Sequence, residues 1–456
     1  MTTSAPRARP GRGNRPRPLK PRSPGWSTAM AVVALGVVVG LVLPRLEQGH
    51  DPSGALNYDA GTAQATLGAI AAGMITLTGF VFTAITLVIQ TIQGMSPRLF
   101  AALTYFGRFP RLFGIFVATF MYALVVLSQV TSDDVPRLSV TLAVVMTLVS
   151  AVLFLRLLVT LRAATTPGGL VRAVSAQMRV AIEQTYPSTP VAAADAPPPA
   201  VSPDRDPGVL VRHSEAPGVL QAFDLDRLSR LAESGDLTIR IHPAVGDFLA
   251  TGTALATVHG KASSGIGAKV GRLVRVGASR TIEQDPAYGV RLIVDIAIRA
   301  LSPAVNDPTT AVQSLDQLDD ILQRLARRPL GPGTVTDSQG RARITYPAPG
   351  WDSLLSLALD EILSYGSGAI QVVRRLRALL LDLAAVCPPD RQTLVHDYLD
   401  QLDRLCASSF TDPMQRRRAE SADHQGLGSP SSRHRVRRAR DSAPAEPDGA
   451  GPMPPD

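Results

Sequence analysis

Residues 64–94 of this chain read QATLGAIAAGMITLTGFVFTAITLVIQTIQG, and this stretch decides the fold class. At alternating steps of three and four, its residues are small or polar: Ala65, Ala69, Ala72, Thr76, Gly79, Thr83, Thr86, Gln90 and Gln93. Such steps place residues on one face of an α-helix. Most of the other residues are large and apolar, so the helix is apolar nearly all round, as membrane-spanning helices are. We call the face formed by these nine residues the polar seam.

The polar seam has two interpretations, and the sequence leaves both open. Small residues allow a second helix to approach closely, and Thr or Gln side chains can hydrogen-bond across such a contact. A row of hydroxyl and amide groups can instead line a path for ions or small solutes. The candidate residues for either role are Thr76, Gly79, Thr83, Thr86, Gln90 and Gln93.

Three further apolar runs accompany this helix in the N-terminal part of the 456-residue chain. Each is close to the roughly 20 residues that cross a bilayer core. We therefore predict a transmembrane domain at 26–161 with four helices, at about 27–46, 64–94, 112–130 and 138–160.

The charges between the four runs predict their orientation. The N-terminal arm, the second connection and the stretch after the fourth run are rich in Arg. The first and third connections contain all the Asp and Glu residues of 1–161, which are Glu47, Asp51, Asp59, Asp133 and Asp134. By the positive-inside rule, both termini are cytoplasmic in a multi-pass inner-membrane protein. The net charge of +8 then faces the anionic inner leaflet, which is the predicted partner. Nucleic acid is disfavoured, because no aromatic residues alternate with the basic residues of the arm.

The remaining chain divides by composition. We predict a disordered basic arm at 1–25, a helical exit from the membrane at 162–186, a Pro/Ala-rich linker at 187–207, a cytoplasmic domain at 208–410 and a disordered tail at 411–456. Short alternating strands fill the first part of the cytoplasmic domain, and amphipathic helices fill the rest. The predicted fold class is thus a four-helix membrane part followed by an α+β domain, strands first and helices second.

A charged cluster in the cytoplasmic domain is the second candidate site. Arg291, Asp295 and Arg299 follow one another at steps of four on a helix that is otherwise apolar. Buried charges must be paired, so an internal ion-pair ladder that fixes the helix is the favoured interpretation, and a ligand site is the alternative. The full candidate set is Arg280, Asp285, Arg291, Asp295, Arg299, Ser302, Asn306 and Asp307.

The Asp307-Pro308 pair marks a helix start. A carboxylate that caps the helix, followed by proline at the first helical position, is a common N-terminal signal. Helix N-termini also bind anions, but the Asp307 carboxylate would repel one, so capping is favoured.

The same region carries a resemblance to a known family. The successions Arg280-Thr281, Asp295-Ile296-Ala297 and Ala300-Leu301-Ser302-Pro303-Ala304, followed by Asn306-Asp307-Pro308, resemble a family of bacterial predicted membrane proteins classed as a domain of unknown function. Residues 64–94 and the following Ser96-Pro97-Arg98-Leu99 are similar to that family too. The resemblance spans most of 60–410 and implies an integral membrane protein with a cytoplasmic domain. It implies no activity, substrate or catalytic residue.

The sequence lacks the residue patterns of several kinds of functional site. It contains no phosphate-binding GxxxxGK loop, no HExxH and no nucleophile elbow, so we name no catalytic residue, metal ligand or cofactor. The two cysteines, Cys387 and Cys406, exclude a disulfide framework. No Asp, Glu or Lys lies in the apolar cores, which disfavours proton- or cation-coupled transport.

These observations favour a homo-oligomeric channel- or transport-like membrane protein regulated by its cytoplasmic domain. The alternative is a membrane-anchored sensor or scaffold whose cytoplasmic domain binds a ligand or a protein. An enzyme ranks third, because no pair of nucleophile and base can be named.

Overall fold

The computed structural model of the chain describes residues 25–47, 58–95, 98–99, 109–132, 134–164, 166–186 and 208–426. The predicted arm up to residue 24, the linker at 187–207 and the tail from residue 427 lie outside the described residues. The chain forms two compact units: Met1–Ile296 with Arg328–Leu354, and Ala297–Arg327 with Leu355–Asp456.

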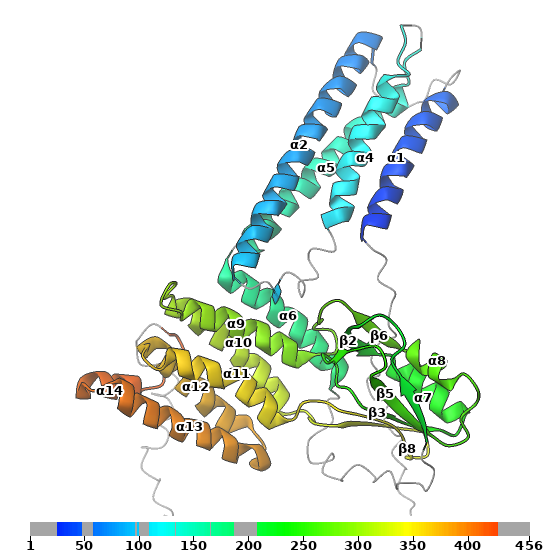
Figure 1. Ribbon diagram of the computed structural model, residues 1–456. Coiled ribbons are helices and arrows are strands. Elements are labelled where there is room, and N and C mark those ends of the chain that lie inside the picture. The colour runs from blue at the N-terminus through cyan, green and yellow to red at the C-terminus, as the bar shows by residue number, and fades with distance from the viewer. Residues whose placement is uncertain are drawn as a thin grey trace, which may run out of the picture. The chain divides into compact units, whose positions relative to one another are not determined.

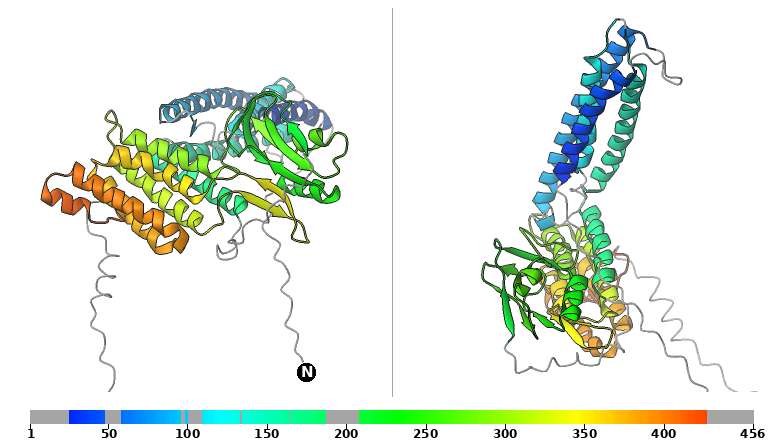
Figure 2. Two further views of the ribbon diagram at one scale, coloured as in Figure 1. Left: turned by 60° about the horizontal axis from the view of Figure 1, so that its bottom comes forward. Right: turned by 90° about the vertical axis from the view of Figure 1, so that its right-hand side faces the viewer.

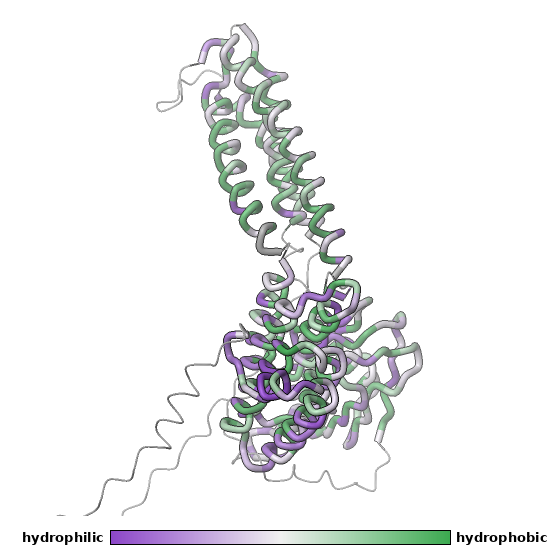
Figure 3. The backbone as a smooth tube through the Cα atoms, turned by 90° about the vertical axis from the view of Figure 1, so that its left-hand side faces the viewer, coloured by the Kyte–Doolittle hydropathy of each residue, from purple (hydrophilic) through white to green (hydrophobic). Residues whose placement is uncertain are grey.

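The first unit begins with four helices that are long and apolar enough to cross a membrane (Figure 1), which confirms the four predicted spans. They are α1 (Gly25–Glu47), α2 (Ala60–Met95), α4 (Phe109–Leu127) and α5 (Arg137–Ala164). Apolar residues dominate all four along their length (Figure 3). Helix α6 (Pro167–Thr185) follows, with Thr166 capping its first turn through a hydrogen bond from Gly169 N.

Helices α1 and α4 approach each other through glycines. A Cβ added at Gly114 of α4 would lie 2.8 Å from Ala29 Cα, and one at Gly36 of α1 would lie 3.1 Å from Ala118 O. Because glycine has no side chain, the two backbones come close enough for extensive van der Waals contact, and larger residues would not fit at these positions. Gly36 and Gly40 form a GxxxG motif, the sequence signal for this contact.

Two sheets follow in the same unit. One sheet has the strand order β1 (Val209–Arg212), β5 (Ala254–His259), β3 (Thr238–Ile241), β8 (Ala342–Tyr346) and β7 (Gly333–Thr336). Strands β4 (Phe248–Leu249), β2 (Gly218–Phe223) and β6 (Val274–Gly277) form the other. Helices α7 (Leu225–Ser234) and α8 (Ile266–Gly271) accompany them, and one apolar core with Leu220, Ile239 and Val258 joins both sheets. This mixed α/β region confirms the predicted fold class.

Local sequence signals account for several of these elements. Asp224 caps α7, because its Oδ1 accepts a hydrogen bond from Arg227 N at 3.0 Å. Strands β7 and β8 form a hairpin, and β8 also pairs in parallel with β3, with Ile344 opposite Ile239. Helix α9 (Pro286–Ala300) then carries the first part of the charged cluster.

The second unit is helical. It contains α10 (Pro308–Ala326), α11 (Trp351–Gly366) from Leu355 onward, α12 (Ile370–Val386), α13 (Pro389–Ser409) and α14 (Pro413–Ala419). The long yellow and orange helices lie side by side in Figure 2. A buried ion pair holds α10 to α12, because Arg375 Nη2 lies 2.8 Å from Asp319 Oδ2. Burial raises the pKa of Asp319, and the Arg375 guanidinium opposes that rise.

The ordered chain extends further than the predicted boundary at residue 411. Helix α14 is capped by Asp412, and the fully buried Asp423 pairs with Arg374 of α12 at 3.8 Å. Asp423 also accepts a hydrogen bond from Gly426 N at 3.1 Å. The sequence of this segment is polar and gives no apolar periodicity, and long-range pairing of its one buried acid supplies the order instead.

Candidate functional site

The polar seam lies on the outward face of α2. Every seam residue is exposed except Thr86, which is half-buried. The opposite face of α2 is buried, and its apolar residues include Leu67, Met74, Val81 and Val88. Within one chain, therefore, α2 packs against the other membrane helices through its large apolar side chains and not through the polar seam.

Space beside the seam is open. A Cβ at Gly73 or Gly79 would meet nothing within 4 Å. Two seam residues, Ala72 and Thr76, line a shallow surface groove between α2 and α5 together with Phe80 and Phe154, whose rings meet edge to face with centroids 6.0 Å apart. The seam is thus accessible to lipid, to water or to a second copy of the chain.

The threonine hydroxyls of the seam donate to their own helix. Thr76 Oγ1 donates to Ala72 O at 2.9 Å, Thr83 Oγ1 to Gly79 O at 3.0 Å and Thr86 Oγ1 to Phe82 O at 2.9 Å. Each hydroxyl proton therefore has an acceptor, while an oxygen lone pair stays free. The amides of Gln90 and Gln93 form no hydrogen bond within the described part of the chain. The seam thus offers acceptors along its length and amide donors at one end.

The charged cluster separates into two pairs within the first unit. The first joins Arg280 to Asp285, with Nη2 and Oδ2 2.6 Å apart, and the guanidinium lies over the Tyr288 ring at 5.2 Å. Asp285 also caps α9, because its Oδ1 accepts a hydrogen bond from Tyr288 N at 3.0 Å. Burial raises the pKa of Asp285, and the Arg280 guanidinium opposes the rise.

Gly246 gives Arg280 the room for this pairing. Its φ of +100° lies in the region that favours glycine, and an added Cβ would collide with the Arg280 guanidinium. Glycine is therefore needed at position 246 for both its backbone conformation and its size.

The second pair reaches back to the segment that follows α2. Asp295 accepts a hydrogen bond from Arg291 Nε at 2.7 Å and a second one from Arg98 Nη1 at 3.1 Å. The Tyr288 hydroxyl donates to Arg98 O at 3.2 Å. Two residues of α9 thus hold Arg98, which lies 197 positions earlier in the chain than Asp295.

Helix α9 also contacts the helix that follows α5. An added Cβ at Gly289 would collide with the Met178 side chain of α6, so glycine allows α6 to pack closely there. Helix α9 is therefore connected to the segments that follow both α2 and α5.

The predicted ladder is incomplete. Arg299 is exposed and makes no ion pair among the described residues, because the Asp295 carboxylate is occupied by Arg291 and Arg98. Sequence reasoning missed Arg98 and Tyr288 as members of this cluster. The sequence signal that could have identified Arg98 is its position shortly after the end of α2.

Ser302, Asn306 and Asp307 form a turn and a helix cap in the second unit. Asn306 adopts a left-handed conformation with φ of 47°, and its N–H donates to Ser302 O at 2.8 Å. Asp307 Oδ1 accepts a hydrogen bond from Thr310 N at 3.1 Å, as expected of the cap of α10. Capping thus occupies the Asp307 carboxylate, as the sequence predicted.

No group of three or more His, Cys, Asp or Glu side chains arranged to hold a metal ion occurs among the described residues. Both cysteines are free and buried, and burial raises the pKa of Cys387 to about 11. A thiol with such a pKa is protonated at neutral pH and is a poor nucleophile.

Comparison with known proteins places the chain in a family. The family described as "Predicted membrane protein (DUF2254)" matches residues 22–382, and the chain belongs to it. The chain is 29% identical over 412 residues to uncharacterized protein Rv1290c of Mycobacterium tuberculosis, a match that covers 86% of this chain and 78% of the relative. The same figures hold for uncharacterized protein Mb1321c of Mycobacterium bovis. No solved structure matches the chain.

Proposed function

We propose that this multi-pass membrane protein is an oligomeric channel- or transport-like protein in which the polar seams of several copies face one another. The observation that carries the proposal is the exposure of the seam on the outward face of α2. A polar stripe that faces lipid tails gains nothing from its amide groups, whereas seams that face one another can hydrogen-bond or hold water.

The proposal includes control of the seam helix by the region after the membrane. Arg98 follows α2 directly and is held by Asp295 and Tyr288 of α9. A shift of α9 would change the position of Arg98, and α9 also contacts α6 through Gly289. The link supports coupling in either direction, because a contact that biases one element biases the other equally.

The proposed orientation follows the positive-inside rule, with both termini and the domain at 208–410 in the cytoplasm. Protease protection in intact spheroplasts tests it with terminal epitope tags. Both tags are expected to survive until the cells are lysed, and cleavage of either tag in intact cells would contradict the orientation.

Ionic current across bilayers that contain the purified protein tests the proposed conduction. We expect a current that Thr83→Leu and Gln90→Leu reduce at least several-fold, because each replaces a polar group of the seam by an apolar one. Phe82→Leu is the matched control: Phe82 is 63% exposed but lies about 100° around the helix from Thr83. Absence of current at every voltage, membrane tension and osmotic gradient would remove the channel proposal.

A second candidate function is a membrane-anchored sensor or scaffold that self-associates through α2. It is favoured by the threonine hydroxyls, which are already satisfied by their own helix and need no water. Association through the seam without any current would select this function. Pull-downs from membranes with the Asp295→Ala and Arg291→Ala variants then show whether the charged pairs contribute to partner binding. If both variants retain every partner of the wild type, the charged pairs have a structural role only.

A further inference from the structure

A cavity of about 400 Å³ lies between the edges of the two sheets in the first unit. Strand β1 is at one edge of the five-stranded sheet and β6 at one edge of the three-stranded sheet, and residues of both strands line the cavity. Helix α8, labelled in Figure 1, supplies a third wall. The volume falls within the roughly 300–1,000 Å³ that is usual for ligand pockets.

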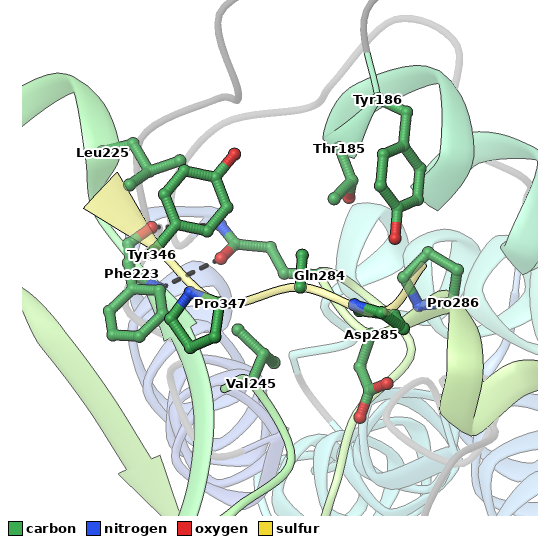
Figure 4. Close-up of a pocket in the computed structure, with 12 residues that line it drawn as sticks. Thr185, Tyr186, Phe223, Leu225, Val245, Gln284, Asp285, Pro286, Tyr346 and Pro347 are labelled. Atoms are coloured by element: carbon green, nitrogen blue, oxygen red, sulfur yellow. Dashed lines mark hydrogen bonds between the residues drawn. The ribbon is translucent and has the colours of Figure 1, made fainter. Parts of the chain in front are cut away.

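A second cavity, at the end of α6, is much smaller. It has a volume of about 50 Å³, and Figure 4 shows the Gln284 amide there bound to the backbone of Phe223 by two hydrogen bonds. Thr185 Oγ1 is buried beside it and has no hydrogen-bond partner among the described residues. A few water molecules fit this space and can satisfy that hydroxyl, whereas a larger ligand does not fit.

Glycines of α8 keep the larger cavity open. Gly267 and Gly271 both line it and lie four residues apart, on one face of the helix. An added Cβ at Gly267 would lie 3.8 Å from Val211 Cγ1 of β1, and one at Gly271 would meet nothing within 4 Å. On the same helix, Ile266 and Val270 are buried in the apolar core. The helix is therefore fixed in place and still leaves a gap beside β1.

Two arginines of this cavity have no acidic partner within the described part of the chain. Arg212 Nη1 donates to Gly252 O at 2.9 Å, and Arg272 Nε donates to Ala268 O at 3.2 Å. Both residues are exposed to solvent. A guanidinium has five N–H donors, so each arginine keeps donors that a ligand can use.

The charge of the cavity favours a monoanion. Arg212 and Arg272 each contribute one positive charge, and Glu215 contributes one negative charge among the described Arg, Lys, Asp and Glu side chains that line it. One positive charge is thus left uncompensated by these side chains. A carboxylate matches it, because a guanidinium binds the two oxygens of a carboxylate with parallel hydrogen bonds.

Apolar side chains form much of the remaining wall. Strand β1 contributes Val211, β5 contributes Leu255, and β6 contributes Val274 and Val276. A ligand whose carboxylate reaches the arginines would place the rest of its structure beside these side chains. Burial of an apolar group there is favourable, because it removes apolar surface from water on both sides of the contact.

Hydrogen bonds to the turn between β4 and β5 hold the wall that carries Arg212. His213 N donates to Thr253 O at 2.9 Å, and Gly252 N donates to His213 O at 2.7 Å. The His213 ring is held as well, with Nε2 3.0 Å from Ala216 O. The wall is therefore formed before any ligand binds, which lowers the entropic cost of binding.

We propose that this cavity binds a small organic monoanion that carries a carboxylate and an apolar ring. The carboxylate accepts hydrogen bonds from Arg212 and Arg272, and the ring lies beside Leu255, Val274 and Val276. The proposal does not depend on conduction, because binding is measured without any current.

Three planar probes of nearly the same shape and different charge test the proposal: benzoate, benzamide and benzamidinium. Saturation-transfer NMR measures each probe against the full chain in nanodiscs of zwitterionic phosphatidylcholine, with empty nanodiscs as the blank. We expect saturable binding of benzoate with a dissociation constant below roughly 10 mM for a probe of this size. Benzamide and benzamidinium should each bind at least roughly ten-fold more weakly, because neither offers a carboxylate to the arginines.

Matched variants locate the binding. Arg212→Gln and Arg272→Gln each remove one guanidinium and are expected to weaken benzoate binding roughly five-fold or more. Arg240→Gln removes the same charge from an exposed residue of β3 outside the cavity and should leave benzoate binding unchanged. Gly271→Leu adds a side chain where the cavity has open space and should abolish benzoate binding.

Thermal unfolding without probe verifies that each variant is folded. The two arginine variants change exposed residues, and a Cβ at position 271 meets no neighbouring atom, so all three should unfold close to wild type. Three outcomes would overturn the proposal. They are equal binding of the three probes, benzoate binding that both arginine variants leave unchanged, and no saturable benzoate binding up to roughly 10 mM.

Discussion

Two helix surfaces in the membrane region are rich in small residues, and the chain uses them differently. On α1 and α4, the glycines lie against the neighbouring helix, so that a Cβ at Gly114 would be 2.8 Å from Ala29 Cα. On α2, Gly79 is equally small, but a Cβ there would meet nothing within 4 Å. Small residues permit close packing without specifying which partner provides it. We call the first surface the α1–α4 contact and compare it with the polar seam below.

The largest expected effect comes from placing the same large side chain on each surface. Gly114→Leu should destabilise the folded protein by about 3 kcal/mol or more, because the new side chain meets the α1 backbone. Gly79→Leu should change the stability of a single copy by less than about 0.5 kcal/mol, because its surroundings are open. Denaturant unfolding in detergent, at concentrations where the protein is monomeric, measures both. Equal destabilisation by the two variants would contradict the comparison.

A smaller effect is expected at the link between α2 and α9. Arg98 is 59% exposed and the Asp295 side chain 12% exposed, so solvent screens this ion pair. A double-mutant cycle of Arg98→Gln and Asp295→Asn should give a coupling energy of about 0.5–1 kcal/mol. The same cycle with Arg299→Gln in place of Arg98→Gln should give no coupling, because Asp295 is occupied by other residues. Additive behaviour of Arg98 and Asp295 would show that the contact does not connect the two helices.

Hydroxyl deletion sharpens the comparison further. Thr119 of α4 is fully buried and its Oγ1 lies 3.2 Å from Ser150 Oγ of α5, so Thr119→Val removes a bond between helices and should cost about 0.6 kcal/mol. Thr83→Val removes only a bond within α2 and should cost a single copy less than that. The measurement is the loss in free energy of unfolding of each variant relative to wild type. A larger cost for Thr83→Val than for Thr119→Val would mean that the seam is packed within the chain.

A fall in pH should lower the stability of the sheet that contains β7 and β8 and leave the packing of both membrane surfaces unchanged. Burial opposes ionisation of Asp337, but hydrogen bonds from Arg341 N, Arg343 Nε and Gln339 N lower its pKa to about 2. A lowered folded-state pKa gives stability that is present above the unfolded value of 3.8 and is lost as the pH falls towards about 2. At neutral pH the contribution of Asp337 to stability is fully present.

Hydrogen exchange along the β7–β8 hairpin measures that loss. Wild-type protection should decrease between about pH 4 and pH 2, whereas Asp337→Asn should start lower and stay flat over that range. A wild-type profile as flat as that of the variant would exclude Asp337 as the titrating group.

The elements that the sequence predicts correctly are those with local causes. Length and hydropathy are enough to identify the four membrane helices, and the Asp307 side chain caps α10 as the Asp307-Pro308 pair predicts. Each of these signals lies within a few residues of the structure that it specifies.

The features that were not predicted depend on residues far apart in the chain. The Arg98–Asp295 contact spans 197 positions, and β3 pairs with β8 across the whole of α9 and α10. The expected place of Arg299 in the ladder fails for the same reason, since a distant arginine occupies its partner. The pattern of α2 identifies its two faces, but which face is outward depends on how α4 and α5 pack, and no local signal encodes that.

Disulfide cross-linking around α2 tests the central claim, that the polar seam is the contact between copies. Single cysteines are introduced at Thr76 and Thr83 on the seam, and at Ile75 and Phe82 as exposed controls, in a chain with Cys387→Ala and Cys406→Ala. We predict that oxidation of membranes links copies through Thr76→Cys and Thr83→Cys but not through the two control positions. Cross-linking that is equal at all four positions, or stronger at Ile75 and Phe82, would contradict the account.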